Sequence, residues 1–172
     1  MIKNDKQYQY TQELARQFAE AIQALEQDRE LQKNDPEGWQ MSLDVKQCHW
    51  QQLQAEISEY ERLINCERKQ PIQIAVESID KWPDVLIKAR IAAHLTQQEL
   101  AEILGIEVHR VKEYEETDYQ CASFLELLEV STVFGLKLDK AVVKVNFEEV
   151  EVARKCAEKW HQARRKKATQ NL

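Results

Sequence analysis

The chain has 172 residues, with 24 lysines and arginines against 30 aspartates and glutamates, a net charge of −6 at pH 7. The sequence contains no run of about 18 apolar residues and no apolar signal region at its start, so we expect no membrane segment and a cytoplasmic location. Its four cysteines are dispersed at positions 48, 66, 121 and 156 without a Cys-x-x-Cys pair, so we predict reduced thiols and no metal site. Only three glycines and three prolines occur, which disfavours long loops.

The first 70 residues have the pattern of two helices. Apolar residues recur every three to four positions over 8–31, which predicts a helix there, and Pro36 and Gly38 mark a break over 32–38. A second helix is expected over about 41–68, with a stripe close to the 3.5-residue repeat of coiled coils at Val45, His49 or Cys48, Leu53, Ile57, Tyr60 and Ile64. Such a hairpin over 1–70 is too thin to bury both stripes alone. We favour a homodimer, and the alternative is packing against the rest of the chain.

The central part of the sequence has the markers of a small helical bundle. Residues 71–80 form a linker with a short alternating stretch at Ile72, Ile74 and Val76, and a domain is expected over 81–136. Thr96 and Glu99 form a capping box at a helix start, and Gly105 is suited to the left-handed residue that ends this helix. A further helix should begin near Glu107, with Val111 and Tyr114 facing inward, and another should end at Gly135.

The last part of the sequence, over 137–172, combines a short strand with a basic helix. Leu136 to Val145 is rich in β-branched residues, which predicts a strand that pairs with 72–76 or with a second copy. Residues 147–167 are expected to form a helix with Val150, Ala153, Ala157 and Trp160 on one side. The predicted fold class is therefore mainly α: a coiled-coil-like N-terminal helical hairpin, a central helix-turn-helix bundle, a short β segment and a C-terminal helix.

The central segment resembles a known family. Its matching residues are Thr96-Gln97-x-Glu99-Leu100-Ala101, then Leu104-Gly105-Ile106, Val111 and Tyr114-Glu115. Over about residues 80 to 138 the chain is similar to the phage-repressor class of helix-turn-helix domains, the XRE or Cro/C1-type family. The resemblance implies a helix-turn-helix fold whose second motif helix, the recognition helix, enters the DNA major groove. The family also includes antitoxins of toxin–antitoxin pairs, which repress their own operons.

The resemblance also implies a set of contact residues. The DNA-binding candidates lie at the start of the first motif helix and along the recognition helix: Gln97, Gln98, Val108, His109, Arg110, Lys112 and Glu113. Glutamine suits adenine edges, and arginine or lysine suits guanine or phosphate. A basic run near the end supplies candidate phosphate contacts: Arg164, Arg165, Lys166 and Lys167.

The charge distribution runs against this expectation. Residues 1–70 hold 9 basic and 13 acidic residues, 71–135 hold 5 and 12, and 136–172 hold 10 and 5, so the net charges are −4, −7 and +5. DNA affinity depends on cations that replace counterions at phosphates, yet the DNA-reading segment is the most acidic. Acidic residues lie in or just after the recognition helix, at Glu107, Glu113, Glu115, Glu116 and Asp118.

Two functions are therefore carried forward. The first is a sequence-specific DNA-binding transcriptional regulator that acts as a homodimer on double-stranded operator DNA, including the case of an antitoxin with a basic toxin as partner. The second is an acidic protein-interaction module with a helix-turn-helix shape that binds a basic protein and not DNA. The sequence has no glycine-rich phosphate loop, serine elbow or histidine cluster, so we predict neither an enzyme nor a cofactor.

Overall fold

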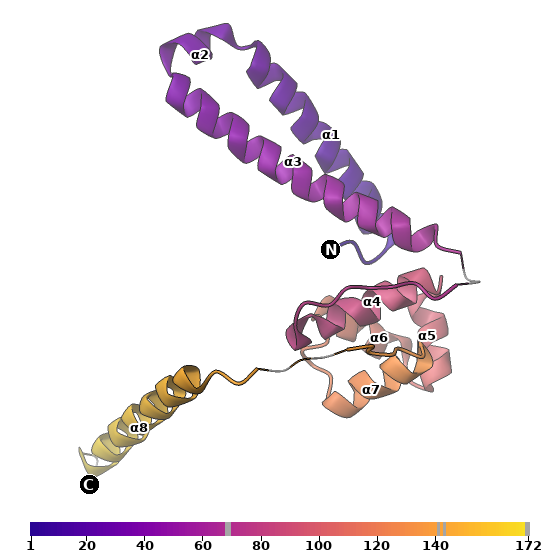
Figure 1. The fold of residues 1–172 in the computed structure, drawn as a ribbon, viewed down its shortest axis with the longest axis vertical. Coiled ribbons are helices and arrows are strands. Elements are labelled where there is room, and N and C mark those ends of the chain that lie inside the picture. The colour runs from indigo at the N-terminus through magenta and orange to yellow at the C-terminus, as the bar shows by residue number, and fades with distance from the viewer. Residues whose placement is uncertain (68–69, 141, 143, 171–172) are drawn as a thin grey trace. The chain divides into compact units, whose positions relative to one another are not determined.

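The fold is mainly α-helical, as predicted. The computed structural model describes residues 1–172 except 68–69, 141, 143 and 171–172, and it describes 163–170 by their backbone alone. The described residues divide into two compact units, Met1–Leu136 and Lys137–Leu172. Their α-helices, labelled in Figure 1, are α1 (Asp5–Gln27), α2 (Arg29–Asn34), α3 (Pro36–Ile64), α4 (Trp82–Ala92), α5 (Gln97–Leu104), α6 (Val108–Glu116), α7 (Phe124–Val133) and α8 (Phe147–Gln170). A short 3-10 helix, η1 (Ile79–Lys81), precedes α4.

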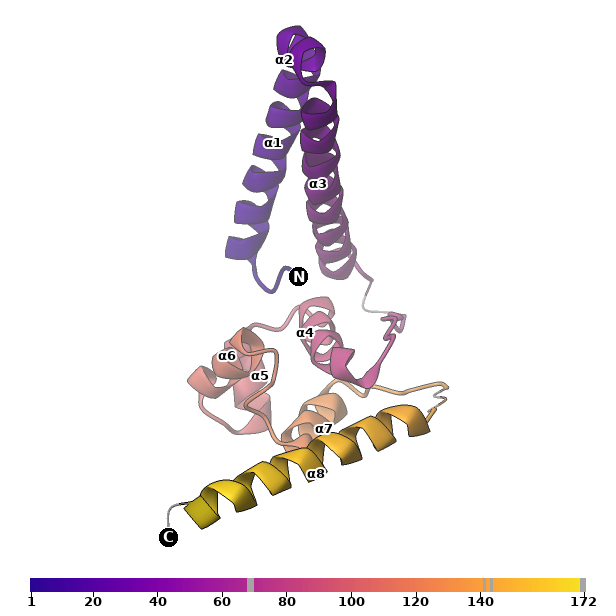
Figure 2. The same ribbon diagram turned by 90° about the vertical axis from the view of Figure 1, so that its left-hand side faces the viewer.

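Helices α1 and α3 lie side by side, with α2 at the end where they connect (Figure 2). We call residues 5–64 the arm. The first arm helix ends at Gln27 rather than near residue 31, and the second starts at Pro36 rather than near 41. Asp28 and Asp35 explain both differences, because each accepts a backbone N–H three residues later and so restarts a helix. Pro36 at the first helical position needs no N–H partner.

Aromatic residues mark the contact between the two long arm helices. Tyr8 stacks on Tyr60 with ring centroids 5.1 Å apart, and Phe18 lies 5.7 Å from His49. Near the α2 end, the Trp39 indole donates a hydrogen bond to the Leu25 carbonyl at 2.8 Å. The buried residues of the two helices are few: Thr11 and Ala15 in α1, and Leu43, Ile57, Tyr60 and Leu63 in α3.

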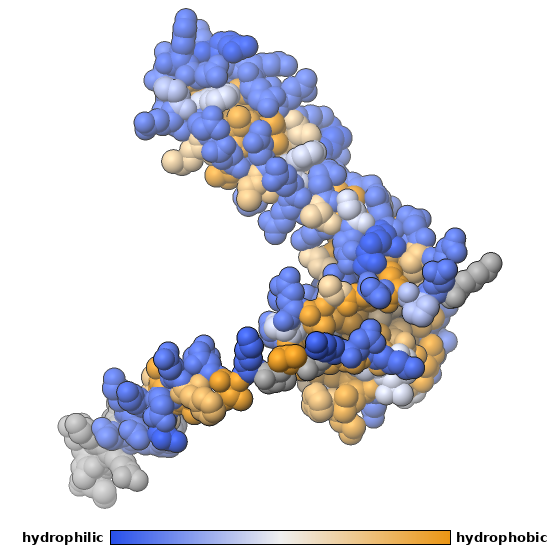
Figure 3. Space-filling model, viewed as in Figure 1, coloured by the Kyte–Doolittle hydropathy of each residue, from blue (hydrophilic) through white to orange (hydrophobic). Residues whose placement is uncertain are grey.

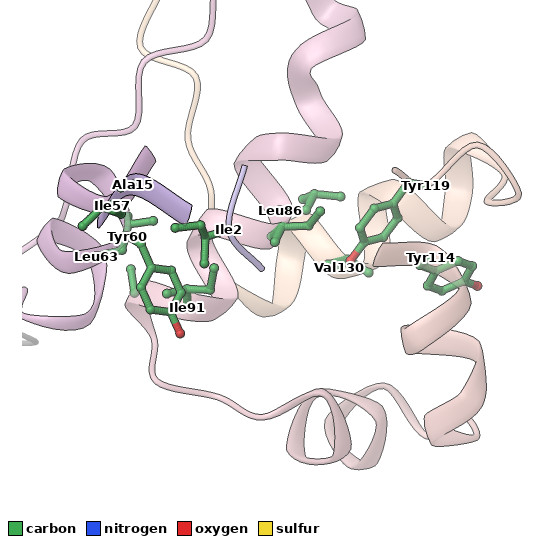
Figure 4. Packing of buried hydrophobic residues seen from close by; sticks show 12 residues of the cluster. Ile2, Ala15, Ile57, Tyr60, Leu63, Leu86, Ile91, Tyr114, Tyr119 and Val130 are labelled. Atoms are coloured by element: carbon green, nitrogen blue, oxygen red, sulfur yellow. The ribbon is translucent and has the colours of Figure 1, made fainter. Parts of the chain in front are cut away.

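The arm shares its core with the helices that follow. Ile57, Tyr60 and Leu63, near the end of α3, belong to one apolar cluster with Ile2 and with residues of α4 such as Ile91 (Figure 4). Lys88 of α4 also pairs with Glu59 of α3 at 2.9 Å. The sequence left open whether a second copy or the rest of the chain covers the arm, and at this end the rest of the chain covers it.

Helices α4 to α7 form a bundle of short elements, and we call residues 82–133 the bundle. Two of its helices begin with capping boxes, in which Thr96 and Ser123 each accept from the backbone N–H of a glutamate that returns the bond. A second apolar cluster consists of Leu100, Ala101 and Val111, between α5 and α6. Gly135 follows α7 at a φ of +58°, as expected for a residue that ends a helix.

The short strand expected over Leu136 to Val145 is not found. None of the described residues in that stretch, nor Ile72, Ile74 and Val76, is in a strand, while Ala141 and Val143 lie outside the described residues. A lone extended segment has unpaired backbone groups and is stable only beside a partner strand. The β-branched pattern therefore did not suffice to predict a sheet here.

The second unit consists mainly of helix α8. The Asn146 side chain accepts from the Glu148 N–H at 3.1 Å just before the helix begins. Every described side chain from 147 to 162 is exposed. The helix was predicted over 147–167, and its backbone extends to Gln170.

Candidate nucleic-acid interface

A capping box starts helix α5, and a left-handed glycine ends it at the tight turn before α6. The Thr96 hydroxyl accepts from the Glu99 N–H at 3.1 Å, and the Glu99 carboxylate accepts from the Thr96 N–H at 2.8 Å. Gly105 follows α5 in the left-handed region with a φ of +68°. A side chain at this position would meet no neighbour within 4 Å, so the requirement for glycine comes from the backbone conformation alone.

The inner face of α6 is packed against the protein, so the residues on its opposite side form the outer face. Val111, Tyr114 and Glu115 retain 0%, 2% and 1% of their exposure. Positions 109, 112, 113 and 116 are exposed. The second helix of the motif therefore presents a defined polar surface, and nothing in the described part of the chain buries it.

A buried ion pair connects α6 to α4 and α5. Arg90 of α4 donates two hydrogen bonds to the Glu115 carboxylate, one of them at 2.9 Å through Nη2, and the two side chains are 7% and 1% exposed. Gln97 at the start of α5 donates a third hydrogen bond to the same carboxylate at 2.8 Å. Gln97 is therefore half-buried and bound within the protein, whereas the sequence assigned it to a phosphate or a base.

The start of the chain extends this network. The Lys3 ammonium donates to the carbonyl of Glu115 and pairs with Asp118 at 2.7 Å, while the Lys3 carbonyl accepts from Arg90 at 2.8 Å. Ile2 is buried in the core beside it. The contacts of Lys3 with Glu115 and Asp118 could not be predicted from the sequence, because residues more than 100 positions apart share no local pattern.

Arg110 is half-buried and bound to side chains of its own protein. Its guanidinium pairs with Glu113 at 2.9 Å and Glu126 at 3.3 Å, and lies 4.7 Å from the centre of the Tyr114 ring. Hydrogen bonding to Tyr114 and to these carboxylates raises the pKa of Arg110 above its ordinary value. The Tyr114 hydroxyl and the Ser123 cap hold the pKa of Glu126 at about 2. The resemblance had assigned Arg110 and Glu113 to DNA contact, and in the structure they pair with each other.

The remaining candidates occupy different environments. Gln98 is exposed and its amide donates to Glu102 at 3.1 Å, and Val108 is half-buried against the Leu100–Val111 cluster. His109 and Lys112 are exposed on the outer face of α6. The basic run, Arg164 to Lys167, lies outside the residues whose side chains are described.

The electrostatic character of this surface is acidic. Exposed carboxylates around the outer face are Glu107, Glu113, Glu116 and Asp118, of which Glu113 and Asp118 have cationic partners within the protein. Lys112 is the exposed lysine of α6. Contact with a polyanion would thus depend on few cations, on His109 and on the backbone N–H groups at the start of α5.

The described part of the chain contains no group of three or more histidines, cysteines, aspartates and glutamates arranged to hold a metal ion. None of its helices combines the length and apolar content that crossing a bilayer requires. A half-open cavity of about 280 Å³ lies between α3 and α4, lined partly by Glu56, Glu59 and Lys88.

No protein-family model, no curated protein and no solved structure matches this chain.

Proposed function

We propose that the protein is a DNA-binding transcriptional regulator that acts as a homodimer, with α5 and α6 as a helix-turn-helix of the repressor type. The observation that carries the proposal is the contact between Gln97 and Glu115 at 2.8 Å, which holds the start of α5 beside α6. Backbone N–H groups at a helix start attract phosphate, and the proposal assigns this role to the start of α5 and base contact to the exposed outer face of α6. A helix-turn-helix protein that reads the major groove uses its second motif helix in this way.

The proposal assigns new roles to the candidate residues. Lys112 and His109 would approach the bases or the backbone, and Gln98 would contact phosphate in exchange for its bond to Glu102. Gln97 would hold α5 against α6 through its hydrogen bond to Glu115. Arg110 would hold α6 through its ion pairs with Glu113 and Glu126. Such an interface has few cations, so we expect modest affinity and a shallow dependence on salt.

The test is binding of the full chain to duplex DNA from upstream of its own gene, measured by fluorescence anisotropy over a salt series. Lys112→Ala should weaken binding and lower the magnitude of the salt slope by about one. The matched control is Lys33→Ala, which removes an exposed lysine of α2 at the far end of the arm. Failure of both upstream and mixed-sequence DNA to bind at low salt would reject a DNA-binding role.

The acidic outer face favours a second function, an interaction module for a basic protein. The exposed Glu107 and Glu116, which have no cationic partner among the described residues, are the observation behind it. An antitoxin would combine both functions. Co-expression with the product of the adjacent reading frame tests this directly: a stable complex that Glu107→Lys with Glu116→Lys disrupts, in a chain that binds no DNA, would support the interaction module.

A further inference from the structure

Helix α8 carries an exposed apolar stripe along one side. Val150 and Trp160 are 47% and 54% exposed, and Ala153 and Ala157 between them are exposed as well. The spacings of three, four and three residues place all four on one face of the helix. Figure 3 shows apolar residues on α8 beside the hydrophilic ones. A helix of this kind gains most of its stability by packing such a stripe against a partner.

The stripe is symmetric about residue 155. Val150 and Trp160 lie five residues from that centre, and the two alanines lie two residues from it. When two copies run in opposite directions, Val150 of one meets Trp160 of the other, and the alanines meet at the centre. Small residues at the centre allow two helix axes to approach closely. Trp160 retains its edge contact with His161, at 5.2 Å between ring centroids, on one side of the stripe.

The charges of α8 distinguish between the two directions of pairing. Residues 147–153 contain three glutamates and no lysine or arginine, whereas 154–167 contain seven lysines and arginines and one glutamate. In the antiparallel register centred on residue 155, residues 147–153 of each copy lie level with 157–163 of the other, so Glu151 and Glu149 lie level with Lys159 and His161 rather than with other glutamates. A parallel pair would place like charges side by side, which is unfavourable.

We propose that α8 pairs in antiparallel orientation with α8 of a second copy of this chain, through Val150, Ala153, Ala157 and Trp160. Pairing of α8 would make the regulator a two-fold symmetric dimer. The biological purpose of this dimer rests on the proposed function, whereas the pairing itself does not. It also places the contact between copies in the second unit, whereas the sequence had suggested the arm.

Cys156 and Glu149 provide a test of direction, because they are seven residues apart and occupy the same side of the helix. In the antiparallel pair the two Cys156 side chains differ in height by two residues, about 3 Å, and the two side chains at 149 differ by twelve residues, about 18 Å. In a parallel pair both positions would be level with their counterparts.

The experiment uses the full chain under mild oxidation, followed by non-reducing electrophoresis. One variant carries Cys48→Ser, which removes the other exposed cysteine. The second carries Cys48→Ser, Cys156→Ser and Glu149→Cys. We expect a covalent dimer at least tenfold faster in the first variant. Equal rates in the two variants would indicate parallel pairing, and no covalent dimer in either would indicate no pairing, so both results overturn the proposal.

A matched pair of substitutions tests the stripe itself. Ala157→Glu places a carboxylate in the stripe, and Val152→Glu places one at a position that is 61% exposed on another face. In sedimentation velocity over a concentration series, Ala157→Glu should be monomeric and Val152→Glu should remain dimeric. A dimer that survives Ala157→Glu contradicts the proposal. Neither assay contains DNA, so failure of the pairing and failure of DNA binding are observed separately.

Discussion

The bundle and the arm bury their residues in different ways. The bundle helices have only 8 to 11 residues, yet seven residues of α4 and three of α6 are buried. Helices α1 and α3 have 23 and 29 residues, and two and four of them are buried. Short helices are unstable alone and depend on tertiary contacts. The bundle is therefore stabilised mainly by its buried core. The arm is stabilised by the backbone hydrogen bonds of its helices, by the contact between α1 and α3, and by the core that the end of α3 shares with α4.

The largest effect should follow from breaking the ion pair inside the bundle. Glu115→Ala leaves Arg90 buried without a counter-charge, which should lower the free energy of unfolding by about 3–5 kcal/mol. Urea unfolding followed by circular dichroism measures this. Glu116→Ala, at the exposed neighbouring position, should change stability by less than about 0.5 kcal/mol.

The double substitution sharpens this result. Replacement of both Arg90 and Glu115 by leucine removes the two charges together, and should recover much of the lost stability. If Glu115→Ala alone were as mild as Glu116→Ala, the ion pair would not be the element that holds α4 to α6.

A smaller effect is expected at the base of the arm. Leu63 is 2% exposed and belongs to the core shared with α4, so Leu63→Ala should cost about 2–3 kcal/mol. Val45, in the middle of α3, is 51% exposed, and Val45→Ala should cost less than about 0.5 kcal/mol. Equal costs in thermal unfolding would mean that the arm is packed uniformly, contrary to the comparison above.

Much of the bundle could be predicted from the sequence, because its signals are local. The Thr96–Glu99 capping box, the left-handed Gly105 and the inward Val111 and Tyr114 all follow from spacings within a few residues, and all are confirmed. The same reasoning did not predict the internal partners of Gln97 and Arg110. Side-chain type indicates what a residue is able to bind, and the fold decides which of those partners is nearest.

Where the signal was not local, prediction was less successful. The contacts of Lys3 with α6 bring together residues at opposite ends of the unit. Helix α4 begins at Trp82, one residue after the expected start of the domain at residue 81, and it has no side-chain cap. Proline fits the first turn of a helix, where its missing N–H is not needed, so Trp82 and Pro83 belong to the helix itself.

The smallest predicted effect lies at the contact between the two regions, where Glu59 of α3 meets Lys88 of α4. Hydrogen bonds from Arg62 first, and then from Lys88, hold the pKa of Glu59 at about 2, below its ordinary 4.5. The folded state thus favours the ionised carboxylate. Its contribution to stability is complete above pH 4.5 and is lost as the pH falls toward 2.

Glu59→Gln should therefore reduce stability at neutral pH by less than about 1 kcal/mol, since both partners remain partly exposed. The difference from the unsubstituted protein should shrink as the pH falls from 4.5 toward 2, in unfolding curves recorded at several pH values. Glu26→Gln, at an exposed position of α1, serves as the control and should show no such trend. A constant difference across that range would mean that Glu59 acts through packing, and that its charge does not hold the arm to the bundle.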